Sequence, residues 1–417
     1  MKAILIAVGS EMLTPFRVDT NSLTVTERLN AVGYDIRMKC VVGDDLDELA
    51  GVLRSAVASV DLVVCTGGLG PTEDDLTRDA LARVLGVSLE LDEQILDGIR
   101  TRFERRGLRM PSINSRQAMV PHGATVVPNG NGTAPGLVAV KDGTTIILLP
   151  GPPREMTPML DAIVRDRLRL ASSGGLYRRV LKITGRTESD VDATSQPIYG
   201  PWTTQDVPIA TTILAVFGQI ELHLTVHARD KSAAEAVLAP AVAALQQALG
   251  PSVYSVDGRS LEAVVGDLLR ETEWTISVAE SCTGGLLASR LTDVPGSSDY
   301  FDRGVVCYSN QAKIELADVP AAAIEANGAV SEAVAAAMAD GIRSRARTVV
   351  GIGITGIAGP GGGSPEKPVG TVAVAVLAGD VRRVRTFQFL GARDQIKYQS
   401  TQAALNMLRL ILLERSP

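Results

Sequence analysis

The stretch Ala279–Gly285 combines residue types that could catalyse acyl transfer. It reads Ala-Glu-Ser-Cys-Thr-Gly-Gly and lies between an apolar run at Thr275–Ala279 and a helical leucine pattern that begins at Leu286. A serine at a strand-to-helix turn lies where backbone N–H groups converge, which suits a nucleophile beside an oxyanion hole. The alternative is that Ser281 only caps the helix and the glycines allow close packing.

A serine nucleophile here would need a base other than histidine. His227 is the last of the three histidines, so a Ser-His-Asp triad within the final third is excluded. Lys313, which follows Tyr308-Ser-Asn-Gln-Ala, is the candidate because a partly desolvated lysine can have a lowered pKa and act as a base. The alternative is a surface lysine on a helix. Cys282 competes with Ser281 as nucleophile, but a buried thiol is unreactive.

A second glycine-rich loop, Thr355–Gly363, follows another apolar run that predicts a strand. Loops at the carboxyl ends of strands favour phosphate or ribose, although this one could also be a simple connection. Arg393, at the start of the closing helix, adds a cation for a phosphate. A serine, a lysine and an arginine around such loops indicate hydrolysis of a phosphorylated small molecule.

The N-terminal third contains a different candidate site. Asp61–Thr77 ends a predicted strand in a glycine-rich loop and opens a predicted helix at Thr72–Leu85. The glycine N–H groups and the helix dipole favour an anion, whereas Glu73, Asp74 and Asp75 would repel one unless a cation lies between them. This combination indicates a divalent metal that bridges carboxylate and phosphate.

Two further observations bear on that site. Asp44 and Asp45 follow another predicted strand and supply more carboxylates at the edge where ligands bind to parallel sheets. In contrast, Thr72 with Asp75 three residues later could be a capping box with ordinary acids in a first helical turn.

The order of predicted elements indicates an α/β protein with three domains. Strands and helices alternate over residues 1–170, as expected for a parallel sheet with helices on both faces, and a hairpin with an Asp142-Gly143 turn follows at 136–149. A short linker at 171–175 precedes a small α+β domain at 176–255. Alternation resumes over 258–417, where the last domain is expected.

Composition excludes several classes of function. Aromatic residues are 4% of the 417, the net charge is −6 and no Lys/Arg block occurs, so a nucleic-acid partner is not expected. The four cysteines form no CxxC pair, as is typical of reduced thiols in the cytoplasm, and no zinc site is indicated. No signal peptide and no membrane-spanning run are recognised, so a cytoplasmic protein is expected.

The N-terminal motifs resemble those of a known family. Thr66–Thr77 (Thr-Gly-Gly-Leu-Gly-Pro-Thr-Glu-Asp-Asp-Leu-Thr) is similar to the signature of the molybdopterin-binding, MoaB-like fold. Gly9-Ser-Glu-Met-Leu13 with Asp19-Thr-Asn21, and Leu149-Pro-Gly-Pro-Pro-Arg-Glu-Met156, resemble the CinA family of competence/damage-inducible proteins over essentially the whole chain. Thr14-Pro-Phe-Arg17 departs from that family, replacing a glycine-containing stretch.

This resemblance implies an N-terminal ADP-ribose pyrophosphatase that requires a divalent metal (Mg, Co, Mn or Ni) and potassium. On that basis Asp44 and Asp75 would hold the metal or the attacking water. The glycines that would cradle phosphate are Gly67, Gly68 and Gly70.

The C-terminal motifs resemble the nicotinamide mononucleotide deamidase domain, which needs no metal. They are Ala279–Gly285, Tyr308–Lys313, Thr355–Pro360 and Lys367–Thr371. The resemblance implies conversion of nicotinamide mononucleotide to nicotinate mononucleotide and ammonia. Ser281 would be the nucleophile, Lys313 its base and Tyr308 a proton relay, with substrate bound by Thr283, Gly284, Thr355, Gly356 and Arg393.

The middle domain resembles a KH-type module, usually an RNA binder. It contains no convincing GxxG loop, so a structural linker and a contact in a homodimer are the favoured interpretation. Two hypotheses follow. In the first, a bifunctional enzyme recycles pyridine nucleotides. In the second, the N-terminal half recognises a pterin or nucleotide without turnover.

Overall fold

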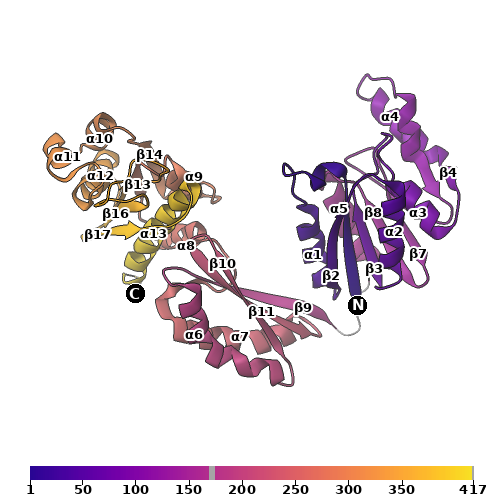
Figure 1. The fold of residues 1–417 in the computed structure, drawn as a ribbon, viewed down its shortest axis with the longest axis horizontal. Coiled ribbons are helices and arrows are strands. Elements are labelled where there is room, and N and C mark those ends of the chain that lie inside the picture. Colours follow the sequence, from indigo (N-terminus) through magenta and orange to yellow (C-terminus); the bar gives the residue numbers. More distant parts are fainter. Residues whose placement is uncertain (169–173, 416–417) are drawn as a thin grey trace. The chain divides into compact units, whose positions relative to one another are not determined.

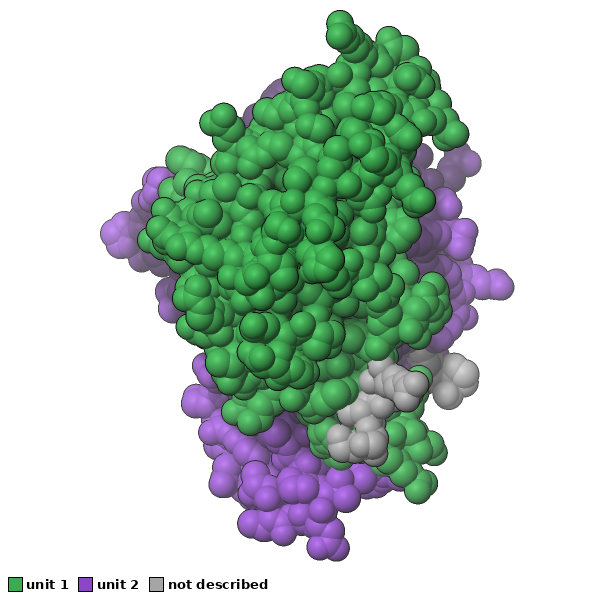
Figure 2. Space-filling model, turned by 90° about the vertical axis from the view of Figure 1, so that its right-hand side faces the viewer, with its two compact units in different colours: residues 1–177, 226–235 green, residues 178–225, 236–417 purple. Residues whose placement is uncertain are grey.

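The computed structural model describes residues 1–168 and 174–415 (Figure 1). They form two compact units, 1–177 with 226–235 and 178–225 with 236–417, which Figure 2 colours green and purple. The expected linker at 171–175 lies mostly outside the described residues.

The N-terminal unit is built on a six-stranded mixed sheet in the order β2-β1-β3-β8-β7-β6. The pairs β1/β2, β1/β3 and β3/β8 are parallel, as the alternation of elements predicts, and the hairpin adds an antiparallel edge. Its strands are β1 (Lys2–Val8), β2 (Asp35–Val42), β3 (Leu62–Thr66), β6 (Thr125–Val127), β7 (Gly136–Lys141) and β8 (Thr144–Leu149).

Successive strand residues face two separate cores, which makes this domain three-layered. Ile4 and Ile6 pack with one set of helices, whereas Ala3 and Leu5 pack with the other, because side chains alternate across a strand. Figure 1 shows these helices around the sheet: α2 (Leu46–Val57) and α3 (Thr77–Leu85) for the first core, and α1 (Asn21–Ala31) and α5 (Pro153–Asp166) for the second.

The helix predicted at Thr72–Leu85 begins later than expected. α3 starts at Thr77, so Glu73, Asp74 and Asp75 precede it and lie in the loop. The capping-box interpretation is therefore wrong, because no helix begins at Thr72. The Asp75 carboxylate instead accepts hydrogen bonds from the Gly70 and Thr72 N–H groups at 2.6 and 2.8 Å, which hold the loop together.

Residues 86–121 carry elements that the sequence pattern did not reveal. They are β4 (Leu89–Leu91), α4 (Glu93–Glu104), a 3₁₀ segment (Ser112–Ala118) and β5 (Met119–Pro121), of which β4 and β5 form a separate two-stranded sheet.

The middle domain has a four-stranded sheet in the order β10-β11-β9-β12. Its elements are β9 (Gly175–Ile183), α6 (Glu188–Tyr199), β10 (Ile209–Val216), β11 (Gln219–Ala228), α7 (Lys231–Leu249) and β12 (Val253–Ser255). The segment 231–252, which contains α7, has the length and hydropathy of a membrane-spanning helix, and 33% of its most apolar window is buried. Leu238, Leu245 and Leu249 lie on one buried stripe, the pattern of a core helix.

The C-terminal sheet has the order β14-β13-β15-β16-β17. Strands β14, β13 and β15 are parallel to one another, whereas β16 is antiparallel to both of its neighbours, β15 and β17. The strands are β13 (Ile276–Glu280), β14 (Phe301–Val306), β15 (Val350–Gly356), β16 (Thr371–Ala378) and β17 (Val381–Gln388). The helices are α8 (Leu261–Glu271), α9 (Leu286–Thr292), α10 (Asn310–Ala317), α11 (Ala321–Asn327), α12 (Glu332–Ala346) and α13 (Arg393–Leu413).

Helices cover both faces of this sheet. α8, α9 and α13 share a core with Ile276 and Val278 of β13, while α12 packs on the opposite face. α12 approaches β15 so closely that a Cβ on Gly353 would lie 2.1 Å from the Ala335 carbonyl oxygen. The glycine at this position therefore sets the distance between helix and strand.

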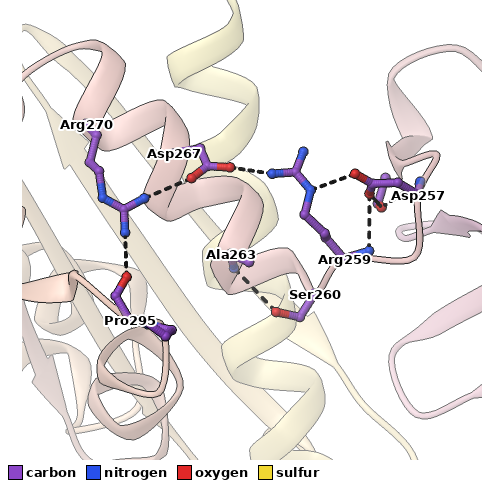
Figure 3. A network of polar contacts seen from close by, with 8 residues as sticks. Asp257, Arg259, Ser260, Ala263, Asp267, Arg270 and Pro295 are labelled. Carbon is purple, nitrogen blue, oxygen red and sulfur yellow. Dashed lines mark hydrogen bonds and ion pairs between the residues drawn. The ribbon is translucent and has the colours of Figure 1, made fainter. Parts of the chain in front are cut away.

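Polar contacts fix the entry into the C-terminal domain (Figure 3). Arg259 contacts both Asp257, at 2.9 Å, and Asp267 of α8, and Arg270 contacts Asp267 at 2.8 Å. Ser260 caps α8 by accepting from the Ala263 N–H. These ion pairs are exposed, so each adds little stability, but together they hold the chain at the start of α8.

Candidate active site

Ser281 lies directly after β13 in a turn stabilised by its neighbour. The buried Glu280 carboxylate accepts hydrogen bonds from the N–H groups of Gly285, Leu287 and Ala288 at 2.8–3.1 Å. Ser281 itself donates its N–H to Ile354 of β15 at 2.9 Å, which anchors the turn to the sheet. Ser281 is therefore not the helix cap, because Glu280 performs that role.

This arrangement corrects the expected oxyanion hole. The N–H groups at the start of α9 bind Glu280 and are not free for a substrate oxygen. The N–H groups of Cys282 and Thr283 follow the serine directly, and within the described residues they donate no backbone hydrogen bond. They are the donors that remain beside Ser281.

Lys313 lies on α10 but is not a surface residue, since its exposed fraction is 2%. Its Nζ lies 3.0 Å from Ser281 Oγ, 3.0 Å from the Cys307 carbonyl oxygen and 3.3 Å from the Tyr308 carbonyl oxygen. Helix α10 starts after Ser309, whose hydroxyl accepts from the Ala312 N–H and caps it.

These three neighbours define how the lysine can act. Burial lowers the pKa of Lys313, because desolvation disfavours the ammonium form. A neutral amine would donate its two hydrogens to the carbonyl groups of Cys307 and Tyr308, and its lone pair would then face Ser281 Oγ. The geometry thus suits removal of the serine proton.

Arg393, the first residue of α13, connects two walls of the site. It donates to the Gly359 carbonyl oxygen at 2.6 Å and to the Tyr308 hydroxyl at 2.9 Å. A cavity of about 270 Å³ lies between these groups. Its lining includes Ser281, Lys313, Tyr308, Thr355, Gly356 and Arg393, so six of the residues expected at this site come together.

The other expected residues have different surroundings. Thr283 and Gly284 do not line the cavity, and the Thr283 hydroxyl is buried with no partner among the described residues. Thr355 lines it, but its hydroxyl donates to the Ala329 carbonyl oxygen at 2.8 Å and so supports the wall. Burial raises the pKa of Cys282 to about 12, which keeps this thiol protonated.

The N-terminal unit contains a larger cavity of about 610 Å³. It brings together the expected residues Asp44, Asp75, Gly67, Gly68 and Gly70, and its lining also includes Glu11, Asp19, Asp74 and Glu155. The carboxyl ends of β1 and β3 meet there, as expected for a parallel sheet.

Hydrogen bonds within this loop change the expected roles of two residues. The Gly67 N–H donates to the Leu149 carbonyl oxygen at 2.9 Å and does not point at a ligand. A Cβ on Gly70 would lie 2.4 Å from the Asp75 carboxylate, so this glycine is required for loop packing. Both Asp75 oxygens accept hydrogen bonds from the loop.

The carboxylates of this cavity fit a metal site that water and substrate phosphates would complete. The described residues contain no group of three His, Cys, Asp or Glu side chains arranged to hold an ion. Mg²⁺ commonly keeps several waters and binds through one or two carboxylates together with substrate phosphates. Asp44, with one oxygen bonded to the Ser10 N–H at 2.8 Å, fits that mode, and Asp75 would contribute through its remaining lone pairs.

The sequence reading missed two residues that shape these sites, Glu280 and Arg78. Arg78 is buried and donates to the carbonyl groups of Leu69 and Gly70 at 2.7 and 2.8 Å, so it holds the glycine-rich loop. The available signal was an arginine in the first turn of a helix directly after such a loop.

A buried Ser-Lys pair in one α/β domain, and an acidic glycine-rich cavity in another, define a multidomain α/β protein with two candidate ligand sites. Three family models match it in succession: "Probable molybdopterin binding domain" at 4–170, "Damage-inducible protein CinA KH domain" at 178–255 and "CinA C-terminal domain" at 258–412. The chain belongs to the CinA family, which confirms the resemblance and the expected fold class.

Relatives match along the whole chain. A CinA-like protein of Koribacter versatilis is 47% identical over 424 residues, covering 99% of this chain and 100% of that protein. One from Solibacter usitatus is 43% identical, covering 98% of each. A crystal structure of the protein CinA from Thermoplasma acidophilum is 37% identical over 40% of this chain and 98% of its own, with a TM-score of 0.38.

Proposed function

We propose that the C-terminal domain is an amidohydrolase that converts nicotinamide mononucleotide to nicotinate mononucleotide and ammonia. The observation that carries this proposal is the 3.0 Å contact between Lys313 Nζ and Ser281 Oγ inside a cavity rimmed by Arg393. The choice of nicotinamide mononucleotide as substrate follows from the motif resemblance of this domain. The nucleophile and the base are Ser281 and Lys313.

The reaction would proceed in two halves. Lys313 takes the Ser281 proton as the hydroxyl oxygen attacks the carboxamide carbon, and the N–H group of Cys282, a residue that lines the cavity, would stabilise the oxyanion. The lysine then returns the proton to the departing nitrogen, which releases ammonia and leaves an acyl ester. Water, deprotonated by the same lysine, hydrolyses the ester and regenerates Ser281.

Ammonia release from nicotinamide mononucleotide tests this proposal. The purified chain should form ammonia and nicotinate mononucleotide in equal amounts, and Ser281→Ala should abolish both. Ser289→Ala, an exposed serine on α9, is the matched control and should behave as wild type. Absence of product from wild type would reject the activity.

A second activity is proposed for the N-terminal domain, hydrolysis of ADP-ribose to AMP and ribose 5-phosphate. The supporting observation is the cavity of about 610 Å³, which combines a glycine-rich loop with Asp44 and Asp75. A bound divalent metal would neutralise phosphate charge and activate water there. The protein itself would position the groups that bind the metal and the phosphate. The Ser10 N–H orients the Asp44 carboxylate, and Asp75 and Arg78 hold the glycine-rich loop through hydrogen bonds to Gly70.

The competing hypothesis is that the N-terminal domain binds a nucleotide or pterin without turnover. Incubation with ADP-ribose and Mg²⁺, followed by separation of AMP, distinguishes the two. Metal-dependent AMP formation supports the enzyme, while calorimetric binding of ADP-ribose without AMP formation supports the binding protein. We further propose a cytoplasmic homodimer that uses small nucleotides and neither nucleic acid nor membrane.

A further inference from the structure

We propose that Lys397 is a phosphate-binding residue of the deamidase site and acts with Arg393 at the cavity rim. The inference rests on the proposed deamidase function. It specifies the substrate class as a nucleoside monophosphate, in preference to the uncharged nucleoside or free nicotinamide.

The positions of both cations follow from helix α13. Arg393 is its first residue and Lys397 comes one turn later, so the two side chains share a face. Arg393 lines the cavity, and Lys397 Nζ lies 3.6 Å from the point where a Cβ on Gly284 would be. Gly284 is exposed in the turn that carries Ser281, so Lys397 lies beside the nucleophile's turn.

The electrostatics of this face favour an anion. Among the described residues, Arg393 donates only to a neutral carbonyl and a hydroxyl, and no hydrogen bond or ion pair joins Lys397 to another residue. Like charges four residues apart on a helix repel each other, and the positive end of the helix dipole adds to that repulsion. A phosphate bound between the two cations would relieve it through charge-assisted hydrogen bonds.

The size of the cavity places the phosphate at this rim. At about 270 Å³ it lies just below the roughly 300–1,000 Å³ of typical ligand pockets. The carboxamide must reach Ser281 inside, so the opposite end of the nucleotide is left at the mouth. Arg393 is exposed and lines the cavity, whereas Lys397 is half-buried one helical turn further along α13 and lies outside the lining.

Steady-state kinetics with two substrates test the role. In Lys397→Ala, KM for nicotinamide mononucleotide should rise about tenfold or more with kcat within about twofold, because one charge-assisted contact to substrate is lost. The KM for nicotinamide riboside, which lacks the phosphate, should not change. Lys397→Arg should retain most affinity, and Arg382→Ala, which removes an exposed charge from β17, should match wild type.

A binding measurement separates this inference from the proposed activity. Calorimetric titration of the full chain with nicotinamide mononucleotide should show the same loss of affinity in Lys397→Ala, even if wild type releases no ammonia. If wild type turns over and Lys397→Ala keeps its KM and affinity, the role of Lys397 is rejected while the deamidase stands. An equal rise in KM for the riboside would also reject it, because a phosphate contact cannot affect that substrate.

Discussion

Lys313 Nζ and Ser281 Oγ lie 3.0 Å apart, and the lysine is held by two backbone carbonyl groups on its other side. The carbonyl groups fix the direction of the amine, while burial lowers the pKa of Lys313 because desolvation disfavours the ammonium form. The proposed base and the proposed nucleophile are thus aligned before any substrate binds, and this alignment has consequences that can be measured.

The first consequence is a dependence of rate on pH. Lys313 must be neutral to accept a proton, so kcat/KM should rise with pH through a pKa below the ordinary lysine value of 10.5. Because the unfolded chain binds a proton that the folded chain has lost, the free energy of unfolding should also rise over the same interval, up to 10.5. A rate that falls as pH rises there would contradict the role of the lysine.

The second consequence is that Ser281 and Lys313 should act as a unit. Ser281→Ala and Lys313→Met should each lower kcat by about a thousandfold or more, because each removes one half of the same proton transfer. The double variant should lose little beyond either single variant. Single-turnover ammonia release measures all three, and independent, multiplicative losses would show that the two residues do not cooperate.

Cys282 offers a direct test of the nucleophile. Its pKa is raised to about 12 by burial, so the reactive thiolate is scarce at neutral pH. Cys282→Ser should therefore retain activity within a few-fold, and thiol-alkylating reagents should inactivate the native enzyme slowly. If Cys282→Ser abolished ammonia release and Ser281→Ala did not, the enzyme would be a thiol hydrolase.

The sequence predicted regular elements well wherever hydrophobic periodicity was strong. The hairpin predicted at 136–149 is present as β7 and β8, which pair on either side of its Asp142-Gly143 turn. The boundary at Thr72 failed because a side-chain contact, that of Asp75 with the loop, decides where α3 begins. Such a contact depends on the folded loop and leaves no periodic signal.

The same limit applies to the site. Residue types and the resemblance predicted the Ser281–Lys313 pair, whereas the roles of Glu280 and Arg78 required knowledge of which backbone groups converge on each side chain. Thr283 shows the opposite limit, because a residue inside a motif was predicted to contact substrate, whereas the structure places it fully buried and outside the cavity lining. Motifs identify the neighbourhood of a site more reliably than the role of each member.

The N-terminal loop predicts different outcomes for two aspartates. Asp75→Asn should lower the free energy of unfolding by about 1–3 kcal/mol, because an amide nitrogen would face the N–H of Gly70 or Thr72. Asp44→Asn should leave stability nearly unchanged, since its amide oxygen can still accept from Ser10, but should lower metal-dependent hydrolysis of ADP-ribose about tenfold or more. Urea denaturation and AMP release measure the two effects.

The opposite result for Asp75 would change its assigned role from loop stability to metal binding. If Asp75→Asn remained as stable as wild type and only required more Mg²⁺, its carboxylate would be a metal ligand and not a loop anchor. Full ADP-ribose turnover in excess chelator would reject a metal at either aspartate.

Residues 251–257 precede the C-terminal domain but contribute contacts to it, so the starting point of an isolated fragment should affect its stability. A fragment that begins at Gly258 should fold, because its sheet and all of its buried core residues except Tyr254 lie within 258–417, but it should be less stable than one that begins at Pro251. Arg409 of α13 is buried and donates to the carbonyl groups of Pro251 and Val253, and Tyr254 packs in the same core as α8. Removing residues 251–257 takes away two acceptors of the Arg409 guanidinium and leaves a gap in the core where Tyr254 packs.

The shorter fragment also loses Asp257, the partner that Arg259 contacts before α8 (Figure 3). We expect the fragment 251–417 to release ammonia at the rate of the full chain, and the fragment 258–417 to have a free energy of unfolding lower by about 1–3 kcal/mol. Arg409→Met in the longer fragment is the matched control, because it removes the charge that needs those carbonyl groups. Equal stability of the two fragments in urea would show that the contacts of Arg409 with residues 251–253 contribute nothing to this domain.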